Sequence, residues 1–83
     1  MAIDYRVLRS LTARELIRAL RRDGFQFVRQ RGSHQQFRHP DGRQVTVAPH
    51  GSGDTFIPKT LKTMIERQAR WTEDDLRRLK ILS

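Results

Sequence analysis

The stretch PDGR, residues 40–43, restricts the fold of this chain more than any other feature, because it separates two short segments of alternating apolar and polar residues. Turn residues between two alternating segments are typical of a β-hairpin. We therefore expect antiparallel strands at about residues 34–39 and 44–49. The segment FQFVR, residues 25–29, is aromatic and β-branched and predicts a preceding strand, joined to the hairpin through a turn at residues 31–33.

Helical patterns flank this predicted sheet. Thr12 and Glu15 have the spacing of a capping box, and the apolar residues that follow recur on one side of a helix, with arginines on the other side. A second helix is expected to start at Pro58, and the residues TEDD are expected to cap a short third helix over residues 72–83. Residues 1–10 have no clear period, so we expect a loosely held lead-in segment.

The expected order of elements is therefore α-β-β-β-α plus a C-terminal helix, in one domain that spans residues 1–83. A three-stranded antiparallel sheet with the helices on one face would bury the apolar side of every element, which is an α+β architecture. A chain of this length buries only about 60–65% of the surface that its unfolded form exposes. We expect any functional site to lie on an open face rather than in a deep pocket.

The register of the hairpin is predicted from its apolar residues. Phe37, Val45 and Val47 are the only large apolar side chains in the two strands, so they should share the core face. A three-residue loop then predicts that Phe37 pairs with Val47 and that His34 pairs with His50. The predicted open face carries the alternate residues His34, Gln36, Arg38, Thr46 and His50.

Two histidines close in sequence raise the question of a metal site. His34 and His39 have the spacing H-x4-H, which falls in the range of zinc ligands. On a strand, however, an odd offset sends the two rings to opposite faces. The sequence also lacks cysteine and has no carboxylate cluster nearby, so we expect neither a metal site nor a cofactor. We expect His39 to be a partly buried structural residue.

The charge of the chain favours a polyanionic partner. Seventeen Lys and Arg residues against nine Asp and Glu give a net charge of +8, and fourteen of the seventeen are arginine, whose guanidinium suits phosphate. A nucleic acid and an acidic protein satisfy this charge equally well. The absence of cysteine, of the apolar core of a signal peptide and of any long apolar run predicts a cytoplasmic protein without membrane contact.

An exposed histidine beside cations can cleave RNA without a metal, because the 2′-hydroxyl attacks the neighbouring phosphorus once its proton is removed. His34 is the candidate for this proton transfer, and His50 is a possible second acid or base. Arg38 or Lys59 could hold the phosphate, with Lys59 at the start of a helix whose free amides favour anions. The same residues would also fit a non-catalytic RNA-binding module or a protein-interaction domain.

Four segments of the sequence carry a family resemblance. They are RELIRALRRDGF (14–25), FVRQRGSHQQFRHPDG (27–42), VTVAPH (45–50) and IPKTLKTMI (57–65). In this order they resemble the HicA family of toxins, the mRNA interferases of bacterial and archaeal HicAB toxin–antitoxin pairs. The resemblance implies a fold like that of a double-stranded-RNA-binding domain, which agrees with the order of elements above.

The resemblance also implies an activity and a site. HicA toxins cleave mRNA without a metal and use the histidine of a Gly-Ser-His motif, which falls here on Gly32, Ser33 and His34. His34 therefore inherits the catalytic role. A second family histidine matches His50 loosely, because APH at residues 48–50 replaces the commoner Pro-x-His order, so the role of His50 stays open.

The implied partners are mRNA and a HicB-type antitoxin, expected to be acidic, that covers the active face. Specific DNA binding is expected only through that antitoxin. RNA is expected to lie across the open face of the sheet. The expected RNA and phosphate contacts are Arg29, Arg31, Gly32, Ser33, Arg38 and Lys59.

Overall fold

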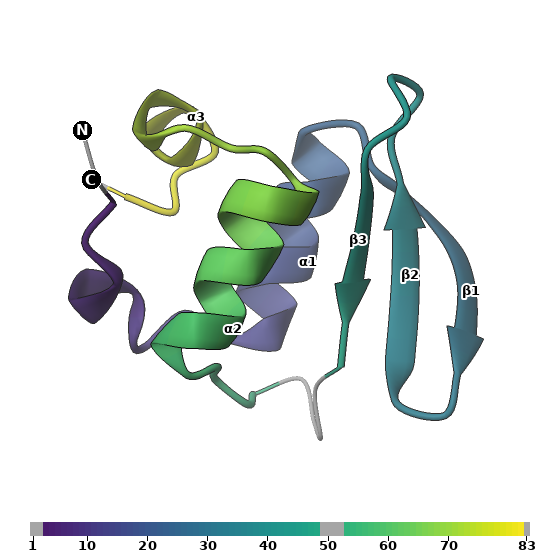
Figure 1. Ribbon diagram of the computed structural model, residues 1–83, viewed down its shortest axis with the longest axis horizontal. Helices are drawn as coiled ribbons and strands as arrows, with labels where there is room; N and C mark the ends of the chain where they lie inside the picture. Colours follow the sequence, from purple (N-terminus) through teal and green to yellow (C-terminus); the bar gives the residue numbers. More distant parts are fainter. Residues whose placement is uncertain (1–2, 49–52, 83) are drawn as a thin grey trace.

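The computed structural model describes residues 3–48 and 53–82. Its elements are, in order, the short 3-10 helix η1 (Tyr5–Leu8), α1 (Ala13–Arg22), β1 (Gln26–Arg31), β2 (His34–Arg38), β3 (Gln44–Val47), α2 (Pro58–Lys62), its π-helical continuation η2 (Thr63–Gln68) and α3 (Glu73–Arg78). The strands form one antiparallel sheet in the order β1-β2-β3, and the helices pack beside it (Figure 1). The expected α+β fold, like that of a double-stranded-RNA-binding domain, is confirmed.

α1 begins at the capping box that the sequence predicts. Thr12 Oγ1 accepts a hydrogen bond from the backbone N–H of Glu15 at 3.2 Å, and a Glu15 carboxylate oxygen accepts one from the backbone N–H of Thr12 at 2.8 Å. These reciprocal bonds satisfy amides that lack a partner within the helix. The arginines of α1 are exposed, and its buried residues are Ala13, Leu16, Ala19 and Leu20.

The second and third helices also start where the sequence predicts. α2 begins with Pro58 and continues through η2. A second capping box, between Thr72 and Asp75, opens α3, but α3 ends at Arg78 and is shorter than the helix expected over residues 72–83. None of the helices in the described part of the chain combines the length and the hydropathy that a membrane span requires.

The backbone at Lys80 ends α3 early. Lys80 has a φ of +63°, its N–H donates to the carbonyl of Arg77 at 3.0 Å, and the N–H of Ile81 donates to the carbonyl of Leu76 at 2.8 Å. A left-handed residue with this pair of backward hydrogen bonds is the Schellman arrangement that terminates helices. The position favours glycine, because other side chains crowd a left-handed backbone.

A two-residue turn at Gly32 and Ser33 joins β1 to β2. Gly32 has a φ of +60°, whereas the φ of Ser33 is not positive. This combination is typical of a type II′ turn, which takes glycine at its first position because a side chain would be strained there. The turn makes Arg31 and His34 the last cross-strand pair of the β1–β2 ladder.

A β-bulge at Val28 decides which side chains of β1 reach each face of the sheet. Phe27 pairs with Phe37, but the next pair is Arg29 with Gln36, so Val28 is an extra residue in the ladder. In an unbroken ladder, Val28 would lie opposite Gln36, and Arg29 would point to the other face. The bulge therefore turns the arginines of β1 toward the face of Gln36.

The predicted pairing of Phe37 with Val47 is wrong, because Phe37 pairs with Val45. The loop has three residues, as expected, but it begins at Pro40 and ends at Gly42, whose φ is +99°. Such a turn favours proline at its second position and glycine at its left-handed position. A loop over residues 41–43, as the predicted pairing requires, would instead put Arg43 into the left-handed conformation. The two registers have the same parity, so the three apolar residues still share the buried face.

The same shift contradicts the predicted pairing of His34 with His50. The observed ladder ends with the pair Gln35 and Val47, and its extension would set Ala48 opposite His34. His50 itself lies outside the described residues.

The core connects one face of the sheet to the helices. Phe37, Val45 and Val47 belong to one buried cluster with side chains of α1, η2 and α3. The buried cluster does not include β1. All six of its residues are exposed, and Phe27 keeps 47% of its surface in solvent. Figure 1 shows β1 as the strand farthest from the helices. The opposite face of the sheet is open.

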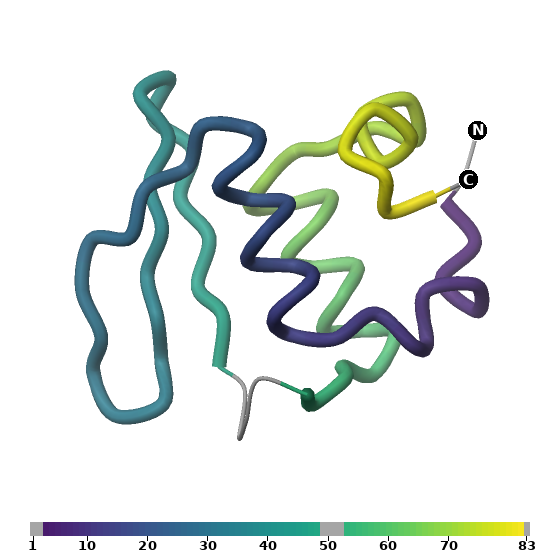
Figure 2. The backbone as a smooth tube through the Cα atoms, turned by 180° about the vertical axis from the view of Figure 1, so that it is seen from behind, coloured from purple at the N-terminus to yellow at the C-terminus, as the bar shows by residue number. Residues whose placement is uncertain are grey.

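Residues 3–11 pack against the helices, whereas we expected residues 1–10 to be a loosely held lead-in segment. Leu8 is 2% exposed, Leu11 belongs to the core, and the Tyr5 hydroxyl donates to the carboxylate of Glu66 on η2. Figure 2 shows this segment running beside the helices at the end of the molecule away from the sheet. Its apolar side chains hold it there, because their burial removes apolar surface from water.

Candidate nucleic-acid interface

His34 occupies one end of the open face. It is the first residue of β2, directly after the exposed turn of Gly32 and Ser33, and its own side chain is exposed. Its cross-strand partner Arg31 is exposed as well. Side chains opposite each other in an antiparallel pair have Cβ atoms about 4.5–5.5 Å apart. The imidazole and the guanidinium can therefore reach the same ligand.

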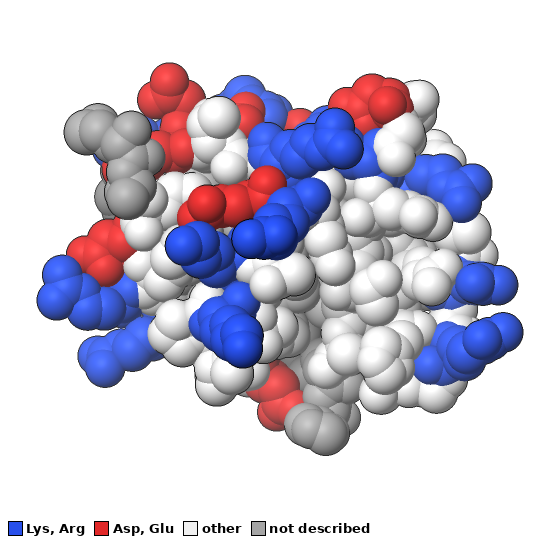
Figure 3. Space-filling view, viewed as in Figure 1, with Lys and Arg blue, Asp and Glu red and all other residues white. Residues whose placement is uncertain are grey.

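Three arginines share this face with His34. Arg29 and Arg31 come from β1 and Arg38 comes from β2, and all three are exposed. The three strands contain no Asp or Glu, so no carboxylate within the sheet offsets their charge. Figure 3 shows basic side chains along the β1 edge of the molecule. A surface of this kind attracts phosphate both by charge and by hydrogen bonding.

Gln36 holds one of these arginines. Arg29 and Gln36 are cross-strand partners, and Arg29 Nε donates a hydrogen bond to Gln36 Oε1 at 3.0 Å. This bond uses Nε, and the two terminal nitrogens of the guanidinium carry further donors that other acceptors could use. The sequence placed Gln36 on the open face but did not reveal this contact, because the contact depends on the bulge in β1.

His39 lies on the other face of the sheet, as its odd offset from His34 predicts. Its Nδ1 accepts a hydrogen bond from the backbone N–H of Asp41 at 3.1 Å, and its Nε2 is 2.9 Å from the carbonyl oxygen of Asp23. A carboxylate oxygen of Asp41 also lies 3.0 Å from Nδ1. Its side chain is 20% exposed and its ring packs against that of Phe25, with centroids 5.1 Å apart. The expectation of a partly buried structural residue is confirmed.

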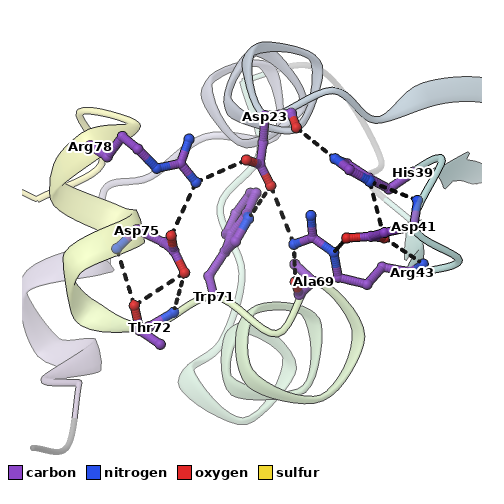
Figure 4. Close-up of polar contacts among 9 residues, drawn as sticks. All are labelled: Asp23, His39, Asp41, Arg43, Ala69, Trp71, Thr72, Asp75 and Arg78. Atoms are coloured by element: carbon purple, nitrogen blue, oxygen red, sulfur yellow. Dashed lines mark hydrogen bonds and ion pairs between the residues drawn. The ribbon is translucent and has the colours of Figure 1, made fainter.

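Asp23, directly after α1, connects three parts of the fold (Figure 4). Its carboxylate accepts hydrogen bonds from Trp71 Nε1 at 2.8 Å and from Arg78 at 2.9 Å, and a guanidinium nitrogen of Arg43 lies 3.3 Å away. The Asp23 side chain is only 8% exposed. The sequence indicated Asp23 only as the end of a helix, because its partners are distant in the chain.

Charge and hydrogen bonding keep Asp23 ionised. Burial raises the pKa of its carboxyl, but the hydrogen bonds from Trp71 and Arg78 and the positive charges of Arg43 and Arg78 outweigh burial, so the pKa lies below its ordinary value. Arg43 also donates to the carbonyl of Ala69 at 2.6 Å and pairs with Asp41 at 2.7 Å. The cluster thereby fixes the β2–β3 hairpin, and with it the strand that carries His34, to the helices.

Two further predicted site residues are not part of this face as described. Lys59 is exposed on α2, in the helical layer rather than on the sheet (Figure 1). His50, the possible second acid or base, lies outside the described residues. Across residues 3–48 and 53–82, no three His, Asp or Glu side chains are grouped closely enough to hold a metal ion.

Comparison with known proteins gives one family. A family model described as "HicA toxin of bacterial toxin-antitoxin" matches residues 13–71 of the 83, which is more than half of the chain. The match runs from the first residue of α1 to Trp71 and includes the whole sheet with His34. No curated protein matches the sequence significantly.

Proposed function

The chain belongs to the HicA toxin family of bacterial toxin–antitoxin systems, and on that premise we propose that it is a metal-independent endoribonuclease. It cleaves mRNA in the cytoplasm with His34 as the catalytic residue, and an acidic HicB-type antitoxin inhibits it. The observation that carries this proposal is the exposed imidazole of His34 directly across the ladder from Arg31, on a face whose strands hold no carboxylate.

The proposed reaction needs two proton transfers. The 2′-oxygen of one nucleotide forms a bond to the adjacent phosphorus and loses its proton, while the bond from phosphorus to the 5′-oxygen breaks and that oxygen gains a proton. His34 performs one of these transfers, and water or a second side chain such as His50 performs the other. The products are a 2′,3′-cyclic phosphate and a 5′-hydroxyl, so atoms and charge balance without a metal.

The arginines of the open face bind the phosphates of the RNA. Arg31 lies nearest to His34 in the ladder and contacts the phosphate under attack, where extra negative charge develops in the transition state. Arg29 and Arg38 bind flanking phosphates, which positions the strand and provides most of the affinity. Gly32 and Ser33 line the turn beside His34, and Lys59 contacts RNA that extends past the sheet.

Expression of the chain in bacteria without an antitoxin tests this function. We expect the wild-type chain to arrest growth and fragment mRNA, and we expect His34→Ala to do neither while remaining folded by thermal unfolding of the purified protein. Growth arrest and mRNA fragmentation by His34→Ala at the wild-type level would contradict the proposal. RNA binding without fragmentation by the wild-type chain would instead identify a non-catalytic RNA-binding module.

A further inference from the structure

The turn between β1 and β2 is held by the side chain of Gln30. Gln30 Nε2 donates a hydrogen bond to the carbonyl oxygen of Gly32 at 2.9 Å. Gln30 pairs with Gln35, which pairs in turn with Val47, so the side chains of these three residues share the face that packs on the helices. The Gly32 carbonyl is therefore directed toward that face, on the side of the sheet opposite to His34.

The direction of this carbonyl fixes the direction of the next backbone N–H. The peptide bond from Gly32 to Ser33 is trans, and a trans peptide is planar with its C=O and its N–H pointing in opposite directions. Because the carbonyl is directed toward the helices, the N–H of Ser33 points to the open face. Arg31 and His34 lie on the open face at the two ends of the same turn. A backbone donor, a guanidinium and an imidazole therefore meet there.

The N–H of Ser33 is accessible to a ligand. Among residues 3–48 and 53–82, no group accepts a hydrogen bond from it. Gly32 and Ser33 are both exposed, and a Cβ on Gly32 would find no heavy atom of the described chain within 4 Å beyond the adjacent residues. Figure 1 shows the turn as the free end of the β1–β2 hairpin, away from the helices. A phosphate group can approach the N–H from this side.

Two features hold the N–H in this direction. The first is the hydrogen bond from Gln30 to Gly32. The second is the side chain of Ser33, because a turn with the central peptide reversed is of type I′ and needs a positive φ at both central residues. A residue with a Cβ is strained at positive φ, so serine favours the observed turn. Glycine at this position would permit both turns.

We propose that the backbone N–H of Ser33 binds the phosphate under attack, and that Gln30 is the positioning residue that directs this N–H to it. The inference rests on the proposed ribonuclease function and adds a group to its site. The non-bridging phosphate oxygens gain negative charge when the 2′-oxygen adds to phosphorus. A donor that is oriented in advance stabilises this charge more strongly than it stabilises the bound substrate. The N–H keeps its proton throughout, so the balance of the reaction is unchanged.

Proline and alanine at position 33 isolate the contribution of the N–H. Proline removes the N–H, alanine keeps it, and both lose the hydroxyl, so Ser33→Ala is the reference for Ser33→Pro. Proline also fits the turn, because its φ of about −65° is close to the value of about −80° at the second position of a type II′ turn. We expect single-turnover cleavage by Ser33→Pro to be at least about tenfold slower than by Ser33→Ala. Affinity for a 2′-O-methylated RNA should stay within a few-fold.

Variants of Gln30 test the positioning role. Gln30→Met keeps the length of the side chain and loses the donor, so the cleavage rate at saturating RNA should fall about three- to tenfold. Gln30→Lys retains a donor that can reach the Gly32 carbonyl and should recover most of the wild-type rate. Gln35→Met is the matched control, because Gln35 lies opposite Gln30 on the same face, and it should leave the rate unchanged. In a Ser33→Gly background, Gln30→Met should cost more than it does beside serine.

The outcomes separate this inference from the function on which it rests. Wild-type cleavage together with equal rates for folded Ser33→Pro and Ser33→Ala would overturn the role of the N–H. If Ser33→Pro does not fold by thermal unfolding, the Gln30 variants decide. Equal rates for Gln30→Met and Gln35→Met, no recovery by Gln30→Lys, or a loss of RNA affinity in place of rate would then overturn the proposal. A wild-type chain that cleaves no RNA would refute the ribonuclease function and this role together.

Discussion

Arg31 and His34 face each other across the last pair of the β1–β2 ladder, next to the two-residue turn, and both side chains are exposed. Their positions have two local causes. Gly32 permits the tight turn that makes them opposite, and the bulge at Val28 sets the face to which the arginines of β1 point. In the proposed function, this arrangement places the imidazole and the guanidinium beside the same phosphodiester.

Arg31→Ala should weaken RNA binding on the order of tenfold, because a charge-assisted hydrogen bond to phosphate is lost. The slope of log affinity against log salt concentration should become shallower by about 0.7, the share of one phosphate contact on single strands. Affinity titrations at several salt concentrations in the His34→Ala background measure both effects. Arg67→Ala, an exposed arginine of η2, is the control. An unchanged salt slope for Arg31→Ala would remove Arg31 from the interface.

Gln36→Ala should act on RNA only through Arg29. Loss of the 3.0 Å hydrogen bond lets the Arg29 side chain rotate freely, so RNA affinity should fall about two- to threefold. The double variant Arg29→Ala/Gln36→Ala should bind RNA no more weakly than Arg29→Ala alone. A double-mutant cycle measures this coupling, and additive losses would show that Gln36 contacts RNA independently.

Asp23→Ala should destabilise the fold by about 2–4 kcal/mol, because the Trp71 N–H loses its acceptor and two arginines lose their common partner. For a chain of this size, each kcal/mol lowers the unfolding temperature by about 4–8 °C. Asp74→Ala is the matched control, because its side chain is 98% exposed, and it should change stability by less than about 0.5 kcal/mol. Equal unfolding temperatures for the two variants would refute a structural role for the Asp23 cluster.

The stability of the fold should decline in acid. Hydrogen bonds from the Thr72 backbone and from Arg78 lower the pKa of Asp75, and the cluster described above lowers that of Asp23. A carboxyl whose pKa is lower in the folded chain stabilises it above the ordinary pKa, and this contribution disappears as the pH falls through the folded-state value. The free energy of unfolding should therefore be nearly constant above about pH 5 and fall below about pH 4. Denaturant unfolding at a series of pH values measures it, and Asp23→Asn should flatten the decline. An identical acid decline in Asp23→Asn would contradict the assignment.

Features set by neighbouring residues were predictable from the sequence. The capping boxes of Thr12 and Thr72, the start of α2 and the positions of both turns depend on local backbone chemistry. The alternation of the hairpin also gave the correct faces for His34 and His39. The alternation could not distinguish the pairing of Phe37 with Val45 from its pairing with Val47, because both put the same residues on each face. The turn geometry that Pro40 and Gly42 favour selects the observed register.

Features set by distant residues were not predictable. The bulge at Val28 depends on how β1 pairs with β2, so the sequence of β1 alone does not predict it. The contacts of Asp23 join segments about 20 to 55 residues apart in the chain. The N-terminal segment shows no helical period because a short 3-10 turn buries little more than Leu8. Tertiary packing, rather than local preference, places each of these elements.

The most direct measurement is the single-turnover rate of RNA cleavage in excess EDTA for the wild-type chain and for His34→Ala, with affinity measured on a 2′-O-methylated copy of the RNA. The wild-type chain should cleave in EDTA and release a 2′,3′-cyclic phosphate, and His34→Ala should be at least about 100-fold slower with affinity within a few-fold of wild type. Cleavage by His34→Ala at close to the wild-type rate, or wild-type cleavage that requires a divalent ion, would contradict catalysis by His34 on the open face of the sheet.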